Sequence, residues 1–374
     1  MLKYILRRIL QAIPVLFGIT IVVYAILISA PGGPTAKFAN NPRVTEADRE
    51  KFKKAWGLDQ PIPIQYGRWL GVLNPDGEGI GVFFGPAVYE IAGVEFHLPH
   101  FLPTPISGGE NGVLHGDFGV SIQSGEPVFD RIARAALPTL ILAGFALVVW
   151  VTTAIAIGVF QAVRRYTVAD TALTVFAYVG FALPTFWLGI MLIYAFSGPG
   201  LNILPAGGMT TTRLSPPFGT DAYWAYFGEN PVEAITDIGT HLLLPLITLV
   251  VVNIAADSRF VRGSMLEALG QDYVRTAKAK GLPGRKVTYK HAFRNAMLPV
   301  TTNIGLELPF LFAGAIVTET IFSWPGVGKL TIDATREFDY PILMGVLLVT
   351  AVFVVFANLL ADVMYAVVDP RIKY

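Results

Sequence analysis

Positive charge is concentrated in one stretch of the sequence. Residues 259–294 contain nine lysines and arginines and only two acids, Glu267 and Asp272. Such a stretch can be held by anionic lipid headgroups, or it can offer a docking surface to a partner on the positive side of a membrane. The basic residues are Arg259, Arg262, Arg275, Lys278, Lys280, Arg285, Lys286, Lys290 and Arg294.

The residue types of this stretch favour a shaped element over an irregular basic loop. Ala, Lys, Arg, Glu and Leu dominate residues 265–280, and all of them are good helix formers. The sequence Gly281-Leu282-Pro283-Gly284 then breaks the helix, and a second helix is expected over 285–297, ending before Pro299. Two short helices joined by a tight turn would form a compact docking knob.

A second group of polar residues lies inside apolar segments. Charge buried in lipid is costly and points to a cavity or a functional pair. Asp257, Glu319 and Asp362 have an alternative interpretation, since each could sit near a membrane boundary that water reaches. We expect Pro184 to kink its helix. The candidate translocation-pathway residues are Asn253, Asn303, Glu307, Glu319 and Pro184.

Several other chemistries are excluded or disfavoured. A phosphate-binding loop needs G-x-x-x-x-G-K-[ST], and the nearest string, SWPGVGKL at 323–330, has Ser323 for the first glycine and Leu330 for the hydroxyl. The chain has no cysteine, and it has no H-E-x-x-H or G-x-S-x-G motif. We therefore predict no catalytic residue, no metal site and no cofactor. The best metal candidates, expected instead to be solvated, are His97, His100 and His115 with Glu95 and Asp117.

The composition is that of a membrane protein with several spans. The chain is 53% hydrophobic and 15% charged, with mean hydropathy +0.55, whereas soluble domains are nearer a quarter charged. The net charge of +1 suggests no nucleic-acid partner. The sequence predicts an all-α polytopic protein, because about 20 apolar residues cross a bilayer as a helix. The six predicted transmembrane helices are 9–30, 137–163, 170–196, 239–261, 300–322 and 341–367.

The positions of lysine and arginine predict that both termini are cytoplasmic. With the N-terminus inside, the inner segments 1–8, 164–169, 259–298 and 368–374 hold 3, 2, 9 and 2 of these residues, while the short outer loops 197–238 and 323–340 hold 1 and 2. A cleaved signal peptide is the alternative for the first segment, but its apolar run is too long for one.

The predicted organisation has four parts. Residues 1–30 form an N-terminal span, 31–136 an extracytoplasmic loop or small domain, 137–367 a core that carries the basic cytoplasmic loop 262–298, and 368–374 a cytoplasmic tail. Within the long loop we expect an amphipathic helix over 45–56. The glycine- and proline-rich residues 74–116 predict loops and a small β element.

The motifs of the chain resemble one family of transporters. SMLEALGQDYVRTAKAKGL followed by HAFRNAMLP is similar to the cytoplasmic loop of inner-membrane permeases of binding-protein-dependent ABC importers. Within these it resembles the dipeptide, oligopeptide and nickel permease family, in particular the subunit with a long first outer loop. Further matching strings are YILRRILQAIPVLFGI, GLDQPIPIQYGRWL, HGDFGVSI, ETIFSWPGVGKL and NLLADVMYAVVDPRIKY. Residues 74–112 resemble an insertion and receive no role.

The resemblance implies a type I importer permease fold and a signature loop whose short helix docks on an ATPase subunit. Arg275-Thr276-Ala277 stands where the family signature has Glu-Ala-Ala, and Gly281 is the motif glycine. The implied partners are a second permease, two ABC ATPases and an extracytoplasmic solute-binding protein, in the inner membrane of a prokaryote. The implied coupling residues are Asp272, Tyr273, Arg275, Ala277, Gly281, His291, Arg294 and Asn295.

Two other function classes compete with an importer permease that does not hydrolyse ATP itself. A self-sufficient secondary carrier or channel would need an ion-coupling site, and often inverted repeats, neither of which is evident in the sequence. A membrane-anchored receptor that works through 31–136 would not need six spans and a shaped inner loop. The resemblance implies dipeptides, oligopeptides or related small solutes, and the sequence leaves the solute itself open among peptides, nickel complexes, glutathione and oligosaccharides.

Overall fold

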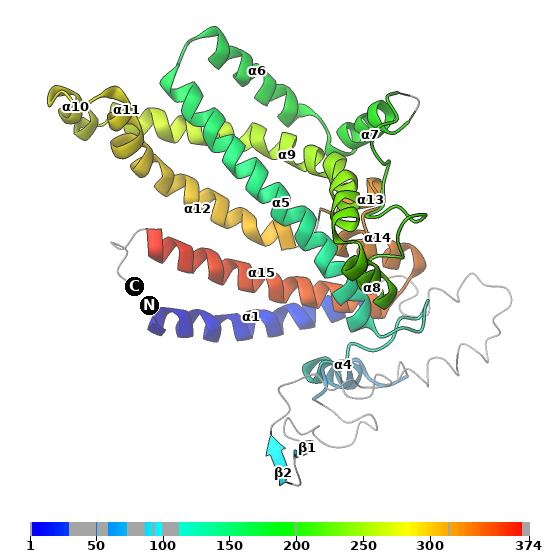
Figure 1. The fold of residues 1–374 in the computed structure, drawn as a ribbon. Coiled ribbons are helices and arrows are strands. Elements are labelled where there is room, and N and C mark those ends of the chain that lie inside the picture. Colours follow the sequence, from blue (N-terminus) through cyan, green and yellow to red (C-terminus); the bar gives the residue numbers. More distant parts are fainter. Residues whose placement is uncertain are drawn as a thin grey trace. The chain divides into compact units, whose positions relative to one another are not determined.

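A computed structural model of the chain describes residues 2–29, 50, 59–72, 87–91, 94–98, 112–198, 200–312 and 315–368 (Figure 1). Most of these residues are helical. The longer helices are α1 (Leu2–Ser29), α5 (Val128–Val163), α6 (Val168–Ala182), α7 (Thr185–Phe196), α9 (Pro231–Gly270), α12 (Phe293–Phe312), α14 (Val327–Glu337) and α15 (Tyr340–Val368). The shorter elements are α4 (Ile62–Leu70), η2 (Val113–His115), α8 (Asp221–Glu229), α10 (Asp272–Ala279), α11 (Gly284–Lys286), the π-helix η3 (Val287–Ala292) and α13 (Ile316–Ile321).

The chain forms two compact units. Unit 1 comprises Met1–Ala12, Ala136–Lys329 and Val352–Tyr374, and unit 2 comprises Ile13–Ala135 and Leu330–Ala351. Unit 1 contains the predicted coupling loop and all five predicted pathway residues.

Helix α9 is the centre of unit 1, since it contacts α6, α7, α8, α10, α12 and α13. Its packing against α5 buries Trp150 and the small residues Ala146 and Ala154 against Val250 and Ile254. Small side chains let two helix backbones approach closely, which is how helices associate in lipid. In Figure 1, α10 and α11 lie at one end of α9, and α7 and α8 lie at the other.

The chain breaks sharply at Pro184, where a kink is predicted. Helix α6 ends at Ala182, α7 begins at Thr185, and the two helix axes differ by 102°. Leu183 is extended, as the ring of a following proline requires, and its N–H still bonds the Val179 carbonyl at 3.2 Å. The sequence predicts the position of the break correctly, but the change in helix direction is much larger than that of the predicted kink.

Unit 2 holds α4 against α1 through aromatic and hydroxyl contacts. The Thr20 and Tyr66 hydroxyls lie 2.7 Å apart, and the Tyr24 hydroxyl donates to Gln65 at 3.3 Å. At the far end of the sequence, the buried carboxylate of Asp339 accepts hydrogen bonds from the Ser121 hydroxyl and from the Ile122 N–H at 3.2 Å. The Asp339 contacts join segments more than two hundred residues apart in the sequence.

A small β element within 74–116 is also confirmed. Strands β1 (Ala87–Ile91) and β2 (Val94–Leu98) pair antiparallel, with Ala87 opposite Leu98 and Ile91 opposite Val94. The helix predicted over 45–56 lies outside the described residues except at Glu50, which is helical.

The helical, membrane-spanning class is confirmed. Within the described part of the chain, four helices are long and apolar enough to cross a membrane, or five if the bent pair α6–α7 is one span. They coincide with the predicted spans that begin at 9, 137, 170, 239 and 341. The remaining prediction, 300–322, falls on α12 and α13, and residues 313–314 between them are not described. A span there stays a prediction.

Candidate functional site

The basic stretch folds as a knob, defined here as residues 271–295. Helix α10 ends in a Schellman turn, in which the Gly281 N–H bonds the Lys278 carbonyl at 2.9 Å and the Leu282 N–H bonds the Ala277 carbonyl at 3.3 Å. Gly281 has φ +73°, a left-handed conformation that favours glycine. Pro283 then caps the next helix. The tight turn predicted from Gly281 to Gly284 is confirmed.

The second helix of the knob differs from its prediction. It does not end before Pro299 but continues through η3 into α12, so that one helical rod runs from Gly284 to Phe312. A proline inside a helix forfeits one backbone hydrogen bond. A π-helix at 287–292 was not evident from the sequence, and such segments are frequent at functional sites.

An apolar core fixes the knob to α9. Val274 and Ala277 on α10 pack with Val287 and Ala292 on η3 and with Met265 on α9. Val274, Met265 and Ala292 are fully buried. Burial of each valine or methionine side chain contributes about 1.5–3 kcal/mol. This core presents α10 as a rigid element, which a docking surface requires.

The predicted coupling residues divide into exposed and buried groups. Asp272 and Arg275 form a weak ion pair at 3.4 Å, with side chains 94% and 76% exposed. Tyr273 and Gly281 are exposed as well, as are Arg294 and Asn295 at the start of α12, while His291 is half-buried. Ala277 is buried in the core, so that in this chain its side chain packs the knob.

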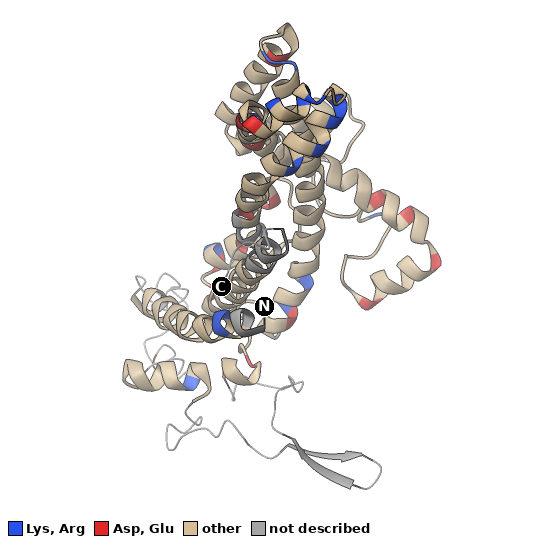
Figure 2. Ribbon diagram, turned by 90° about the vertical axis from the view of Figure 1, so that its left-hand side faces the viewer, with Lys and Arg blue, Asp and Glu red and all other residues tan. Residues whose placement is uncertain are grey.

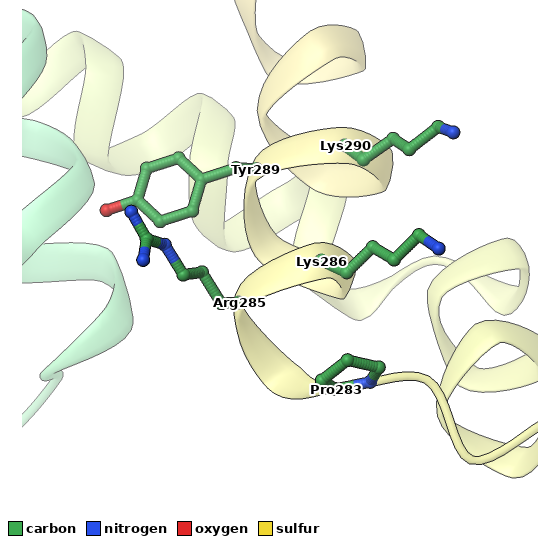
Figure 3. Close-up of a pocket in the computed structure, with 5 residues that line it drawn as sticks. All are labelled: Pro283, Arg285, Lys286, Tyr289 and Lys290. Carbon is green, nitrogen blue, oxygen red and sulfur yellow. The ribbon is translucent and has the colours of Figure 1, made fainter.

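The charge of the knob is strongly one-sided. Figure 2 shows lysine and arginine gathered around α10, α11 and η3, with few acids among them. A shallow hollow on this surface is lined by Pro283, Arg285, Lys286, Tyr289 and Lys290. In Figure 3, Arg285 and Tyr289 lie together on one side of the helix, and Lys286 and Lys290 extend side by side from another.

Two of the predicted pathway residues meet in a polar network between helices. The Asn303 amide donates to Glu307 Oε1 and to Asp257 Oδ1, each at 3.2 Å. The other oxygen of Asp257 accepts from Trp150 Nε1 at 2.5 Å. The network therefore joins α5, α9 and α12.

Asp257 belongs to this network, although it was not among the five candidate pathway residues. Its position near the end of the predicted span 239–261 suggested a membrane boundary. Helix α9 in fact continues to Gly270, and Asp257 is only 6% exposed. Asp257 is therefore buried inside the chain, and its depth in the membrane stays a prediction. The spacing of Asn303 and Glu307, one helical turn apart, was the available sign of a shared face.

The other predicted pathway residues lie apart from this network. Asn253 bonds the Leu249 carbonyl of its own helix at 2.8 Å. Glu319 is fully buried by other residues of the chain, and its depth in the membrane stays a prediction. Its carboxylate accepts from the Thr139 hydroxyl at 2.8 Å and from the Lys329 N–H at 3.1 Å.

These contacts show what the SWPGVGKL string does. Instead of leaving backbone N–H groups free for a phosphate, the turn bonds them to side chains of the chain itself: Val327 N–H to Thr139 at 2.8 Å, and Lys329 N–H to Glu319. Trp324 is fully buried and donates to the Pro138 carbonyl at 2.9 Å. Within the described residues, no group of three or more His, Asp or Glu could hold a metal, and His100 lies outside them.

A buried ion pair near the start of α6 also escaped the sequence analysis. Arg262 donates to both oxygens of Asp170, at 3.0 and 2.9 Å. The same carboxylate accepts from the N–H of Tyr166, whose φ is +63°. The pair ties the α5–α6 turn to α9. No local pattern links two residues so far apart in the sequence.

Comparison with known proteins covers the whole chain. Residues 154–374 match the family model of the binding-protein-dependent transport system inner membrane component, and residues 1–81 match the model of the N-terminal part of such membrane components. The oligopeptide transport system permease protein AppB of Bacillus subtilis strain 168 is 36% identical over 375 residues, which is 100% of both chains.

Two relatives from Escherichia coli K12 show the same similarity. The dipeptide transport system permease protein DppB is 35% identical over 383 residues, covering 100% of this chain and 99% of its own. The probable D,D-dipeptide transport system permease protein DdpB is 32% identical over 360 residues, covering 96% and 94%.

Proposed function

Because this chain belongs to the family of inner membrane components of binding-protein-dependent transport systems, we propose that it is the permease subunit of an ABC importer that takes up dipeptides or oligopeptides. The names of its full-length relatives support the solute class. Uptake follows from an ATP-driven change of conformation, in which the spans open alternately to the two sides of the membrane.

The observation that carries this proposal is the rigid knob. Helix α10 presents Asp272, Tyr273 and Arg275 to solvent, while Val274 and Ala277 anchor it on the opposite face. A partner that pushes on α10 therefore moves α9 and α12 with it, since all three share one core. We assign ATPase coupling to Asp272, Tyr273, Arg275, Gly281, His291, Arg294 and Asn295, with Ala277 as a packing residue.

The lack of a phosphate-binding motif in the sequence indicates which partners the chain needs. Its sequence has no phosphate-binding loop, so ATP hydrolysis belongs to two ATPase subunits, and this chain has no enzymatic activity of its own. A second permease completes the pathway, and an extracytoplasmic binding protein delivers the solute. The transport partners include no nucleic acid.

The placement in the membrane completes the proposal. The chain is a multi-pass protein of the prokaryotic inner membrane, with both termini and the knob in the cytoplasm and residues 31–136 outside. Within the spans, Asn303 and Glu307 line the solute pathway next to Asp257. Pro184 shapes the corner between α6 and α7, and Asn253 on α9 and Glu319 on α13 complete the set of pathway residues.

Gly281 offers a sharp test of docking. A side chain added at Gly281 would meet nothing within 4 Å in this chain, so a loss of function there reports on backbone strain or on a partner. Gly281→Asn is the control for strain, because asparagine tolerates left-handed φ better than most residues. We expect Gly281→Asp to abolish uptake of a labelled dipeptide in proteoliposomes of the whole complex while the chain still inserts.

Gly284→Asp adds the same charge at the far end of the turn, where a side chain also meets nothing within 4 Å. We expect this variant to retain more uptake than Gly281→Asp. Full uptake by Gly281→Asp would refute docking at α10.

Affinity purification of the chain from mild detergent adds a second readout. Recovery of a second permease and ATPases supports the importer, whereas gradient-driven uptake by the chain alone would favour a secondary carrier.

A further inference from the structure

The hollow lined by Pro283, Arg285, Lys286, Tyr289 and Lys290 has a volume of about 560 Å³ and opens to solvent. The side chains of Arg285, Lys286, Tyr289 and Lys290 are all exposed. No acid occurs in the sequence between Asp272 and Glu307. Among the described residues, no carboxylate forms an ion pair with a basic residue of this hollow. The surface is therefore cationic and uncompensated.

The spacing of these basic residues causes a charge repulsion that a bound anion would relieve. Lys286 and Lys290 are four residues apart and extend side by side in Figure 3. Like charges at this spacing destabilise a helix. Arg285 and Tyr289 repeat the spacing one residue earlier. The arginine supplies a planar, bidentate donor that fits phosphate oxygens, and the tyrosine supplies a hydroxyl donor.

The position of the hollow along the helix sets its distance from the bilayer. The helix runs without a break into α12, and residues 296–306 carry no charge. At about 1.5 Å per residue, Lys290 lies about 9 Å and Lys286 about 15 Å before Ala296, the first residue of this uncharged run, which leads into the predicted span 300–322. Headgroup layers extend about 5–8 Å beyond the hydrocarbon on each side. Long basic side chains reach such an interface, and tyrosine is enriched there.

We propose that this hollow binds the phosphate headgroup of an anionic phospholipid, at the point where η3 leads into the membrane. Arg285 and Tyr289 donate to the headgroup oxygens, and Lys286 and Lys290 neutralise the charge. The bound lipid would hold the knob against the bilayer, next to the surface assigned to the ATPase on α10 and at His291, Arg294 and Asn295. A protein partner with an acidic surface is the competing occupant that the experiment must exclude.

The test uses the full-length chain in mild detergent, titrated with phosphatidylglycerol and followed by native mass spectrometry. The double variant Lys286→Gln/Lys290→Gln should weaken phosphatidylglycerol binding on the order of tenfold, because each basic residue near an anionic surface adds to affinity. Lys278→Gln/Lys280→Gln is the matched control, since it removes the same charge from exposed positions at the C-terminal end of α10. It should leave binding unchanged, and Lys286→Arg/Lys290→Arg should retain binding.

Three results would overturn the proposal. Equal weakening by both glutamine double variants would show a general charge effect. Equal binding of phosphatidylcholine and phosphatidylglycerol, or full competition by inorganic phosphate alone, would show that no anionic lipid is selected. Normal lipid binding by Lys286→Gln/Lys290→Gln, with loss of the co-purifying ATPase, would assign the hollow to the protein partner. These lipid readouts do not depend on the transported solute, so they can fail independently of the proposed function.

Discussion

At the scale of single residues, the ion pair of Asp170 and Arg262 holds α6 to α9. The Asp170 side chain is 5% exposed and that of Arg262 is 27% exposed. Removing one partner of a buried pair leaves an uncompensated charge. We expect Asp170→Asn to lower the free energy of unfolding by about 2 kcal/mol, less than for a fully buried pair because water still reaches Arg262. Thermal unfolding of the purified chain in detergent measures this.

The control is an ion pair in solvent. Asp272 and Arg275 are also joined by a hydrogen bond, but both side chains are largely exposed, and exposed pairs contribute little to stability. Asp272→Asn should therefore leave the unfolding temperature unchanged, although it lies on the proposed docking face. Equal unfolding temperatures for Asp170→Asn and the unmodified chain would show that the α6–α9 contact is held by packing alone.

At the scale of elements, the contact between α5 and α9 depends on Gly158. A side chain there would place its Cβ 2.6 Å from the Ser258 carbonyl oxygen and 2.6 Å from the Val261 Cβ. The helices would have to separate, and overpacking of this kind costs about 1–3 kcal/mol. We expect Gly158→Ala to lower the unfolding temperature of the purified chain.

Gly144 supplies the matched control on the same helix. A Cβ at Gly144 would meet nothing within 4 Å, and alanine is the better helix former. Gly144→Ala should leave the unfolding temperature the same or raise it. If both alanine variants behaved alike, the close approach at Gly158 would not matter for stability.

The helices also show which features of the fold can be predicted from the sequence and which cannot. Hydrophobic length located the long helices, and the turn at Gly281 followed from local chemistry. The lengths of α5 and α9 could not be predicted, because both helices extend past their apolar runs and are held there by tertiary contacts. The Glu319, Asp257 and Asp170 contacts join residues 90 or more positions away in the sequence, and no periodicity encodes such pairs.

At the scale of the whole molecule, the family could be predicted from sequence, because it depends on strings of residues, whereas the solute stayed open. The polar network could be predicted only in part. Asn303 and Glu307 share one helix face and were found together, whereas Trp150 and Asp257 reach them from two other helices. The predicted orientation in the membrane rests on counts of lysine and arginine, and a labelling experiment can test it directly.

The absence of cysteine from the sequence makes that experiment clean, because every labelled thiol is one that was introduced. Lys278 on α10 and Arg213 in the loop before α8 are both exposed. Since positive charge is retained on the cytoplasmic side, we expect Lys278→Cys in intact cells to react with a membrane-impermeant maleimide only after permeabilisation. Arg213→Cys should react without it, and the unmodified chain should not react at all. The reverse pattern would place the knob outside, where no ATPase can reach it, and would refute the proposed coupling.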